Sequence, residues 1–379
     1  MMNECLFPGM LIDPPTTEGV KYAGSKLKLL PHILELANLT NYKSVFDGFS
    51  GTTRVGQAFS QVGKVVHSND RSVWSEVFGV CYLKNNKNRR DYSRLIDHLN
   101  AVKPQDGWYT ENYGGVITRE SVDNGVQVDG TKKPWLLKNT RKLDAIRDEI
   151  ERLDLDHVEK CVALTSLILA LDRVDNTLGH YAAYLKKWAA RAHQDLKLRV
   201  PLVFDNSPEN KVTRGDVFES VIRTESDLAY FDPPYGSNNE KMPPSRVRYS
   251  AYYHLWTSVC KNDKPELFGK VNRRADTSDR ISGSIFEEFR KNSDGRFMAI
   301  EAIDKLIQLT PCRWIMLSYS SGGRATASEL NEIIQTNGKL IKTVEVDYKK
   351  NVMAMMTSTN EWLRDADKPN REFIFLMEK

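Results

Sequence analysis

Short apolar runs typical of buried β-strands alternate with amphipathic helical patterns near both ends of the chain. Strands are predicted at residues 44–47, 64–70, 228–231, 314–320, 341–348 and 372–377, and the same rhythm returns near residue 212. Helical periodicity occurs at residues 27–39, in the segment that ends at residue 61, and at 299–308 and 327–336. Six or seven strands that alternate with helices predict an α/β fold.

Between residues 73 and 210 this alternation stops and helical patterns dominate. They cover residues 73–83, 92–99, 141–153, 157–171 and 181–196, while a glycine-rich loop dotted with aromatic residues occupies 106–135. We therefore expect a mainly helical insert at 73–210 between two parts of one catalytic domain, 1–72 and 211–379.

The composition of the 379-residue chain, 40% hydrophobic and 27% charged, is that of an ordinary globular protein. The longest apolar run, within 162–171, is interrupted by Thr165 and Ser166 and falls short of the roughly 18 residues of a membrane span. The first residues lack the basic and apolar regions of a secretory signal. Five scattered cysteines without a C-x-x-C pair indicate reduced thiols and no zinc site. We expect a cytoplasmic protein without a bound metal.

The net charge of +4 says little, but its distribution is uneven. Residues 241–274 contain eight lysines and arginines against two acidic residues. Such a basic segment suits phosphate contacts with a nucleic acid, although a solvated surface loop has the same composition.

The apolar run at 228–231 ends in Asp232-Pro233-Pro234-Tyr235, and the chain is organised around this ledge (residues 232–235). The prolines end the strand because they fix φ and offer no N–H. Ligands bind at the carboxyl ends of strands in open α/β sheets. Acceptor oxygens beside a flat ring suit an exocyclic amine on a planar base. A proline-rich turn capped by its aspartate is the alternative, and we assign that role to the second Asp-Pro-Pro at 13–15.

Two further stretches are typical of a nucleotide-binding α/β site. The first strand leads into a small-residue turn with Gly48, Gly51 and Gly56, which matches neither G-x-G-x-x-G nor a P-loop. The second strand ends at Asp70, at the spacing of the acid that holds a ribose in such sites. Asp70 is also well placed to cap the helix that begins near Ser72.

Two loops carry candidate binding residues. The loop at 20–26 precedes a helix, and its Lys26 supplies a cation for a carboxylate or phosphate unless it is merely solvent-exposed. The loop at 172–181 joins two predicted helices with Asp, Asn, Thr, Gly, His and Arg close together, and Lys186 and Lys187 follow. This loop is either a nucleic-acid contact surface or a capped helix–helix turn.

Taken together and in this order, these stretches resemble the Dam-like (α-group) amino-methyltransferases, which methylate adenine N6 in DNA and often belong to restriction–modification systems. The matching motifs are Lys-Tyr-Ala-Gly-Ser-Lys at 21–26, Phe-Ser-Gly-Thr-Thr at 49–53, Asp70, the Asp-Asn-Thr-x-Gly-x-Tyr stretch at 175–181, Gly-Asp-Val-Phe at 215–218, the ledge, and Tyr-Ser-Ala-Tyr-Tyr-His at 249–254. One departure is Thr53, which stands where the family has the second glycine of Phe-x-Gly-x-Gly.

The resemblance implies a Rossmann-like sheet that binds S-adenosylmethionine, with the helical insert as target-recognition domain. The implied cofactor-binding residues are Tyr22, Lys26, Asp47, Phe49, Gly51, Thr52, Thr53, Asp70, Asp216, Val217 and Asp232. In the implied mechanism a flipped-out adenine donates hydrogen bonds through its two N6–H groups to Asp232 and the Pro233 carbonyl and stacks on Tyr235, and no metal is required. The catalytic residues would be Asp232, Pro233, Pro234 and Tyr235.

The implied partner is double-stranded DNA, with a separately acting restriction endonuclease as a possible associate. DNA contacts are expected from the insert and from residues 236–280. The candidates are Arg173, Asn176, Tyr181, Lys186, Lys187, Arg246, Arg248, Tyr253, His254, Arg273 and Arg274. Three alternatives remain open: a cytosine-N4 DNA methyltransferase, which needs the same acceptors and ring; an RNA target, although no separate RNA-binding module is evident; and a non-catalytic nucleotide-binding regulatory protein.

Overall fold

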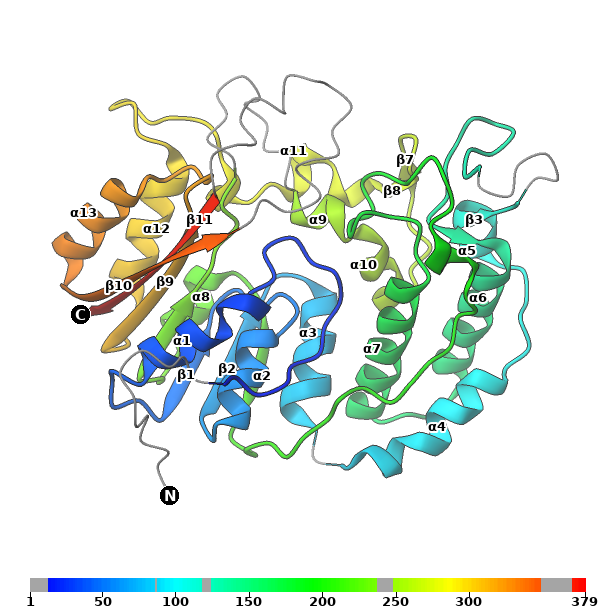
Figure 1. Cartoon of the computed structure of the whole chain (residues 1–379), viewed down its shortest axis with the longest axis horizontal. Helices are drawn as coiled ribbons and strands as arrows, with labels where there is room; N and C mark the ends of the chain where they lie inside the picture. Colours follow the sequence, from blue (N-terminus) through cyan, green and yellow to red (C-terminus); the bar gives the residue numbers. More distant parts are fainter. Residues whose placement is uncertain (1–12, 86, 118–123, 237–247, 349–369) are drawn as a thin grey trace.

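Seven strands form one sheet, which confirms the predicted α/β fold (Figure 1). The computed structural model describes residues 13–85, 87–117, 124–236, 248–348 and 370–379. Within these ranges the strand order is β10-β11-β9-β6-β1-β2-β5. The strands are β1 (Ser44–Asp47), β2 (Val65–Asp70), β5 (Lys211–Arg214), β6 (Leu228–Phe231), β9 (Trp314–Ser320), β10 (Lys339–Tyr348) and β11 (Asn370–Glu378).

The register of the central strands brings several chain segments to one edge of the sheet. β1 pairs in parallel with β2 and β6, and β6 pairs in parallel with β9. Asp47 at the end of β1 lies opposite Tyr230, two residues before Asp232. β11 differs, because it runs antiparallel between β9 and β10. The carboxyl ends of the parallel strands and the amino end of β11 therefore lie at the same end of the sheet.

Helices cover both faces of the sheet. Helices α1 (Leu30–Ala37) and α2 (Arg54–Gln61) pack on one face with Val45, Leu228 and Tyr230. On the other face the covering helices are α8 (Val217–Val221), α12 (Met298–Leu309) and α13 (Ala327–Asn337). All four residues of β6 are buried, as expected for a central parallel strand that is covered on both faces.

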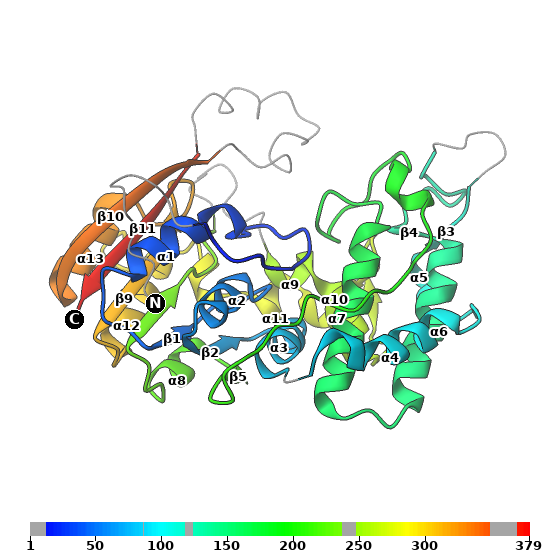
Figure 2. The same cartoon turned by 60° about the horizontal axis from the view of Figure 1, so that its bottom comes forward.

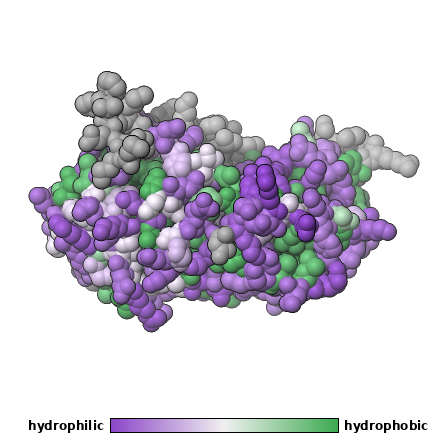
Figure 3. All heavy atoms as spheres, turned by 90° about the horizontal axis from the view of Figure 1, so that it is seen from below, coloured by the Kyte–Doolittle hydropathy of each residue, from purple (hydrophilic) through white to green (hydrophobic). Residues whose placement is uncertain are grey.

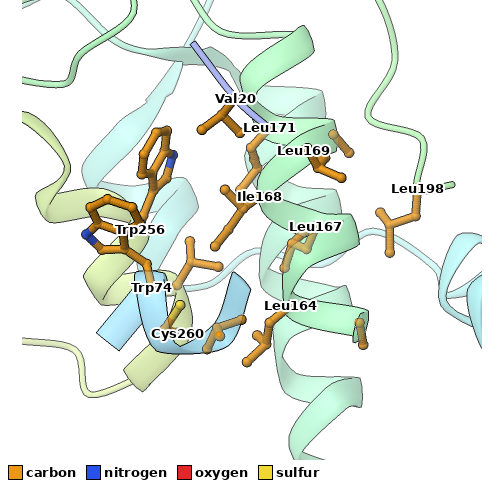
Figure 4. Packing of buried hydrophobic residues seen from close by; sticks show 14 of the residues in the cluster. Val20, Trp74, Leu164, Leu167, Ile168, Leu169, Leu171, Leu198, Trp256 and Cys260 are labelled. Atoms are coloured by element: carbon orange, nitrogen blue, oxygen red, sulfur yellow. The ribbon is translucent and has the colours of Figure 1, made fainter. Parts of the chain in front are cut away.

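A second lobe is built from helices and lies beside the sheet in both views (Figures 1 and 2). Its helices are α4 (Arg89–Ala101), α5 (Trp108–Tyr113), α6 (Leu137–Arg152) and α7 (His157–Arg173). Residues 161–171 of α7 are all buried, so the longest apolar run of the chain is a core helix. Figure 4 shows Leu164 and Ile168 of this helix on the same side as Trp74 and Trp256.

Two helices connect the lobes across the predicted domain boundaries. α3 (Val73–Gly79), which opens the predicted insert, also covers the sheet: a Cβ on Gly79 would lie 2.8 Å from Cγ1 of Val212 in β5. α10 (His254–Lys261), from the segment 211–379, contributes Trp256 and Val259 to the core of the helical lobe. The division at residues 72 and 210 stays a prediction, with α3 and α10 as the bridging helices.

The predicted helix at 181–196 is wrong. Apart from a 3-10 turn at Ala190–His193, this segment is irregular. Its main-chain N–H groups donate to distant residues instead of to the preceding turn: Tyr181 donates to the carbonyl of Tyr252, and Leu185 to that of Asn176. The predicted loop at 106–135 likewise contains α5.

Shorter elements complete the described chain. Two small sheets pair β3 (Gly114–Gly115) with β4 (Trp135–Leu136), and β7 (Leu267–Phe268) with β8 (Arg273–Arg274). Helices α9 (Tyr249–Tyr252) and α11 (Asp279–Ser282) lie with α10 between the two lobes (Figures 1 and 2). The remaining turns are η1 (Leu27–Leu29), η4 (Ala275–Thr277), η5 (Ile285–Glu287) and a π-helix, η2 (Val80–Lys84).

The face in Figure 3 is predominantly hydrophilic, with smaller apolar areas between the polar ones. None of the helices within the described ranges combines the length and apolar character needed to cross a bilayer.

Candidate active site

A cavity of about 390 Å³ lies at the carboxyl ends of the central strands. The whole ledge lines it, directly after β6. The structure brings to the same cavity nearly every residue that the sequence assigned to a cofactor: Tyr22, Lys26, Asp47, Phe49, Gly51, Thr52, Asp70, Asp216, Val217 and Asp232. Thr53 is not among the described residues that line it.

Asp232 has two unequal carboxylate oxygens. Oδ2 is ion-paired with Nζ of Lys26 at 3.1 Å. Oδ1 is buried and accepts no hydrogen bond from any residue that the structure describes. Burial raises the pKa of Asp232 to about 6, although the ammonium of Lys26 acts in the opposite direction. Oδ1 is therefore available to accept a hydrogen bond from an N–H group of a ligand.

Lys26 is buried under the ledge, so the alternative of a solvent-exposed lysine is wrong. Its side chain is 6% exposed, and its ammonium lies 3.1 Å from Asp232 and 3.3 Å from Oε1 of Glu372. It also donates to Oη of Tyr235 at 2.7 Å. Burial alone would lower the pKa of Lys26, but the carboxylates of Glu372 and Asp232 outweigh burial and raise it, so the ammonium stays charged.

Glu372 is a site residue that sequence reasoning missed. It comes from β11, lies opposite Ser320 of β9, and is 6% exposed. Oε1 accepts a hydrogen bond from Oη of Tyr235 at 2.5 Å. A single acid before an apolar run gives no local signal of such a contact.

Tyr235 is held at both ends. Its hydroxyl lies between Lys26 and Glu372, and its carbonyl accepts the N–H of Arg324 at 2.9 Å. Its ring centroid lies 4.7 Å from that of Tyr319. The ring is half-buried and lines the cavity, so it presents part of its surface to a ligand.

Asp47 is a second buried acid at this edge. Both of its oxygens are buried and lack a hydrogen-bond partner of normal geometry in the described chain, although the N–H groups of Phe49 and Gly56 face them. Burial, together with the negative charges of Asp232 and Asp70, raises the pKa of Asp47. A buried carboxylate without a partner favours a cationic or N–H-bearing ligand.

The turn after β1 is held by Asp70. Its Oδ2 accepts the N–H of Gly51 at 3.0 Å, and its Oδ1 accepts the N–H of Ser72 at 2.8 Å. Ser72, not Asp70, is the N-cap residue of α3, so Asp70 supports the start of the helix from outside. Gly51 has φ +47°, and a Cβ there would lie 3.2 Å from Oη of Tyr22.

Thr53 occupies a backbone conformation that favours glycine. Its φ is +62°, which explains why the resembling family has glycine at this position. The side chain is fully buried, and its hydroxyl finds no hydrogen-bond partner among the described residues. Thr53 shapes the turn from behind the cavity wall.

Aromatic rings form two walls of the cavity. Phe218 stacks on Phe286 with ring centroids 5.6 Å apart, and Phe49 meets Phe286 edge-on at 5.1 Å. Beside them, Asp216 caps α8 by accepting the N–H of Phe218 at 2.9 Å. On the other side Tyr22 lies 5.4 Å from Tyr249, a cavity residue that the sequence placed in a motif but not in the site.

Five predicted DNA contacts are buried and engaged within the protein. The structure contradicts their direct exposure to DNA: Asn176, Tyr181, Tyr253, His254 and Arg274 are at most 1% exposed. Arg274, for example, is ion-paired with Asp263 and Asp276. The Tyr253 hydroxyl accepts the N–H of Ala23, and Asn176 binds the main chain of the loop that follows it. These side chains fix the loops between the lobes. The loop at 172–181 follows α7 but leads into an irregular segment, so it is not a helix–helix turn, and its Asn176 and Tyr181 are engaged within the protein.

The other predicted DNA contacts have different surroundings. Lys186 and Lys187 are exposed on the helical lobe. Arg173 lines a second hollow of about 320 Å³ together with Lys197 and Arg199. Arg273 is half-buried, and its guanidinium lies 5.0 Å from the ring of Phe268. Arg248 is half-buried, and Arg246 lies outside the described residues.

The arrangement combines a free buried acceptor on Asp232, the half-buried Tyr235, and a cavity with an acid at the carboxyl end of each of the strands β1, β2 and β6. It suits a planar ligand with an amino group together with a second ligand that carries positive charge and a ribose.

Comparisons with known proteins give a consistent result. The family model described as D12 class N6 adenine-specific DNA methyltransferase matches residues 22–291. Modification methylase StsI of Streptococcus sanguinis is 31% identical over 337 residues, which cover 83% of this chain and 46% of that protein. Type II methyltransferase M.FokI of Planomicrobium okeanokoites is 29% identical, over 87% of this chain and 49% of that protein.

A shorter relative, Type II methyltransferase M.NlaIII of Neisseria lactamica, is 26% identical over 87% of this chain and 92% of its own length. The chain thus spans about half the length of StsI and M.FokI, and it matches M.NlaIII over nearly its whole length.

Proposed function

Because the chain belongs to the D12 class N6 adenine-specific DNA methyltransferase family, we propose that it methylates adenine N6 at a short double-stranded DNA sequence. The observation that carries this proposal is the free Oδ1 of Asp232, a buried acceptor that lines the cavity together with the half-buried Tyr235. An adenine amino group has two N–H bonds to donate, and the adjacent Pro233 carbonyl is the second acceptor.

S-adenosylmethionine is the cofactor that this family implies, and the residues present fit it. The two buried oxygens of Asp47 are suitable acceptors for its ammonium, and Asp70 at the end of β2 suits its ribose hydroxyls. The wall of Phe49, Phe218 and Phe286 suits its adenine ring. When bound, the cofactor supplies a methyl group on a positively charged sulfur.

The residues of the chain then have distinct roles. Asp232 accepts a hydrogen bond from one N6–H group and orients the nitrogen lone pair into the cavity, and Tyr235 packs against the base. Lys26 holds the Asp232 carboxylate in place without filling its second oxygen. Positioning of this kind lowers the barrier without a covalent intermediate on the protein. The expectation that no metal takes part stays a prediction.

The target base has to leave the DNA stack to bring its amino group to the buried Oδ1 of Asp232. We propose that the insert and the helices between the lobes hold the DNA while the base is flipped. The words "modification methylase" in the name of StsI support placing this chain in a restriction–modification system with a separately acting endonuclease. The free, buried Cys81, Cys161, Cys260 and Cys312 support a reducing, cytoplasmic location beside the DNA.

The proposal is tested by methyl transfer from labelled S-adenosylmethionine to unmethylated bacterial DNA, followed by nucleoside analysis and modified-base sequencing. The expected product is N6-methyladenine within one short motif. Labelled N4-methylcytosine would keep the chemistry but overturn the base, and the absence of transfer with retained cofactor binding would favour the regulatory alternative.

A pair of variants tests the site itself. Asp232→Ala should abolish transfer and retain DNA binding, because it removes the acceptor and leaves the lobe surfaces intact. Asp227→Ala is the matched control, since this aspartate lies at the opposite end of β6 and accepts N–H groups of Lys43 and Ser44. Full methylation by Asp232→Ala would contradict the site assignment.

A further inference from the structure

A buried carboxylate lies behind the ledge, on the only strand that runs antiparallel to β9 among the described strands of the main sheet. Oε1 of Glu372 lies 3.3 Å from Nζ of Lys26, 2.5 Å from Oη of Tyr235 and 3.4 Å from Oγ of Ser318. Glu372 is not among the described residues that line the cavity. Any effect on a ligand therefore passes through the residues that it touches.

The first of these residues is Lys26, whose ammonium is shared between two acids. It lies almost midway between Asp232 and Glu372, at 3.1 and 3.3 Å. Because one positive charge serves two carboxylates, Asp232 is only partly neutralised. A fully paired Asp232 would be a weaker acceptor for an amino group.

The second residue is Tyr235, whose hydroxyl is used on both sides. It accepts a hydrogen bond from Lys26 and donates one to Glu372. These two bonds fix the hydroxyl end of the ring. The main chain of Tyr235 is held separately, because its carbonyl accepts the N–H of Arg324. A ring that has to pack flat against a base benefits from such a fixed plane.

We propose that Glu372 is a positioning residue for methyl transfer. By sharing Lys26, Glu372 keeps Asp232 a strong acceptor, and by binding the Tyr235 hydroxyl it holds the ring in the plane against which the target base packs. This inference rests on the proposed function. The inference adds to the proposed site a residue from β11, a strand that lies outside the region of 22–291 matched by the family model.

The charge of Glu372 also has a measurable effect on Asp232. Burial raises the pKa of Asp232 to about 6, Lys26 lowers it, and Glu372 and Asp70 raise it. Other titratable groups that interact electrostatically with Asp232 are Asp47, Tyr22, Tyr230, Tyr235 and Tyr249. Neutralising Glu372 removes a negative charge and leaves Lys26 to Asp232 alone, and both changes lower the pKa of Asp232.

The test is Glu372→Gln, which keeps the shape and an acceptor for Tyr235 but removes the charge. Above neutral pH we expect kcat to fall by about tenfold or more, with the affinities for DNA and cofactor within about threefold of the wild type. In a plot of kcat against pH, the acid limb should move to lower pH than in the wild type. Glu378→Gln is the matched control, because Glu378 is on the same strand and is ion-paired with Arg313 far from the ledge.

A merely structural role of Glu372 predicts a different outcome. It would lower the melting temperature and kcat but leave the acid limb where it is in the wild type, and this result would overturn the inference. The Tyr235→Phe variant separates the two paths. If Glu372 acts partly through the hydroxyl, the effects of Glu372→Gln and Tyr235→Phe on kcat will not multiply.

One measurement remains decisive even without enzymatic turnover. The Asp232 carboxyl can be titrated by infrared spectroscopy in protein with isotope-labelled aspartate, with Asp232→Asn as the subtraction reference. A lower pKa in Glu372→Gln supports the inference, and an unchanged pKa overturns it. Absence of methyl transfer by the wild type would contradict the proposed function, and the titration would then decide only whether Glu372 controls the charge of Asp232.

Discussion

The main-chain N–H of Gly51 donates a 3.0 Å hydrogen bond to Oδ2 of Asp70, which joins the turn after β1 to the end of β2. Asp70 also accepts the N–H of Ser72 through its other oxygen. One carboxylate thus fixes the turn on which the cofactor is proposed to lie, and its remaining lone pairs are the acceptors that we propose for the ribose hydroxyls.

We expect Asp70→Ala to weaken cofactor binding by about 10-fold to 100-fold, the equivalent of one or two hydrogen bonds to a charged group. Asp70→Asn keeps one acceptor oxygen and should lie between Ala and the wild type. Isothermal titration calorimetry with S-adenosylmethionine measures this order. An Asp70→Ala protein with wild-type affinity would exclude Asp70 from the cofactor site.

The φ of +62° at Thr53 leads to a prediction about stability. A Cβ in this left-handed region costs about 1–2 kcal/mol, whereas glycine avoids the cost. We therefore expect Thr53→Gly to be more stable than Thr53→Ala by about 1 kcal/mol, as measured by urea unfolding.

The neighbouring residue is the control for this comparison. Thr52 is also buried but is not among the residues with positive φ, so alanine should be more stable than glycine there by about 0.5–1 kcal/mol. The same order of alanine and glycine at both positions would show that the turn relaxes in solution.

Local sequence signals predicted the ledge, because prolines end a strand wherever it lies in the fold. The same reasoning placed Asp47 and Asp70 at strand ends, and the parallel sheet brings them together. Glu372 was out of reach of this reasoning: its contact with Tyr235 spans 137 residues and depends on the antiparallel register of β11.

Exposure was the second thing that the sequence could not settle. The polar loop at 172–181 has the composition of a contact surface, yet Asp175 is buried and binds Lys21, Thr177 and Arg191. Local richness in polar and aromatic residues does not tell whether their partners are nucleic acid or other parts of the chain. Asn176 and Tyr181 were assigned to DNA for this reason.

His254 predicts how stability depends on pH. Burial lowers its pKa to about 3, and Arg273 and Arg274 act in the same direction, against a hydrogen bond with the carbonyl of Tyr181 and the charge of Asp276. Below about pH 6.5 the unfolded chain binds a proton at this histidine and the folded chain does not, so stability falls as pH decreases toward 3.

Between pH 7.5 and 5.5 this single group should cost about 1 kcal/mol of unfolding free energy. His254→Gln removes it, so the variant should lose about 1 kcal/mol less than the wild type over the same range in urea unfolding experiments. Parallel pH dependence of the two proteins would mean that His254 is hydrated in solution.

Lys186 and Lys187 are the exposed cations that remain among the predicted DNA contacts of the helical lobe. A lysine that neutralises a DNA phosphate releases about one counterion on binding. We expect Lys186→Ala and Lys187→Ala each to reduce the salt dependence of DNA binding by about one unit in a plot of log K against log salt concentration.

Two control positions show whether a change in the salt dependence is specific to Lys186 and Lys187. Lys103→Ala removes an exposed lysine two residues after the last residue of α4 and should leave the slope unchanged. Arg274 is buried and paired with two acids, so a change there should alter stability before it alters the salt slope. Unchanged slopes for both Lys186 and Lys187 would exclude this surface from DNA binding and leave Arg173, Arg248 and Arg273 as the predicted phosphate contacts to be tested among the described residues.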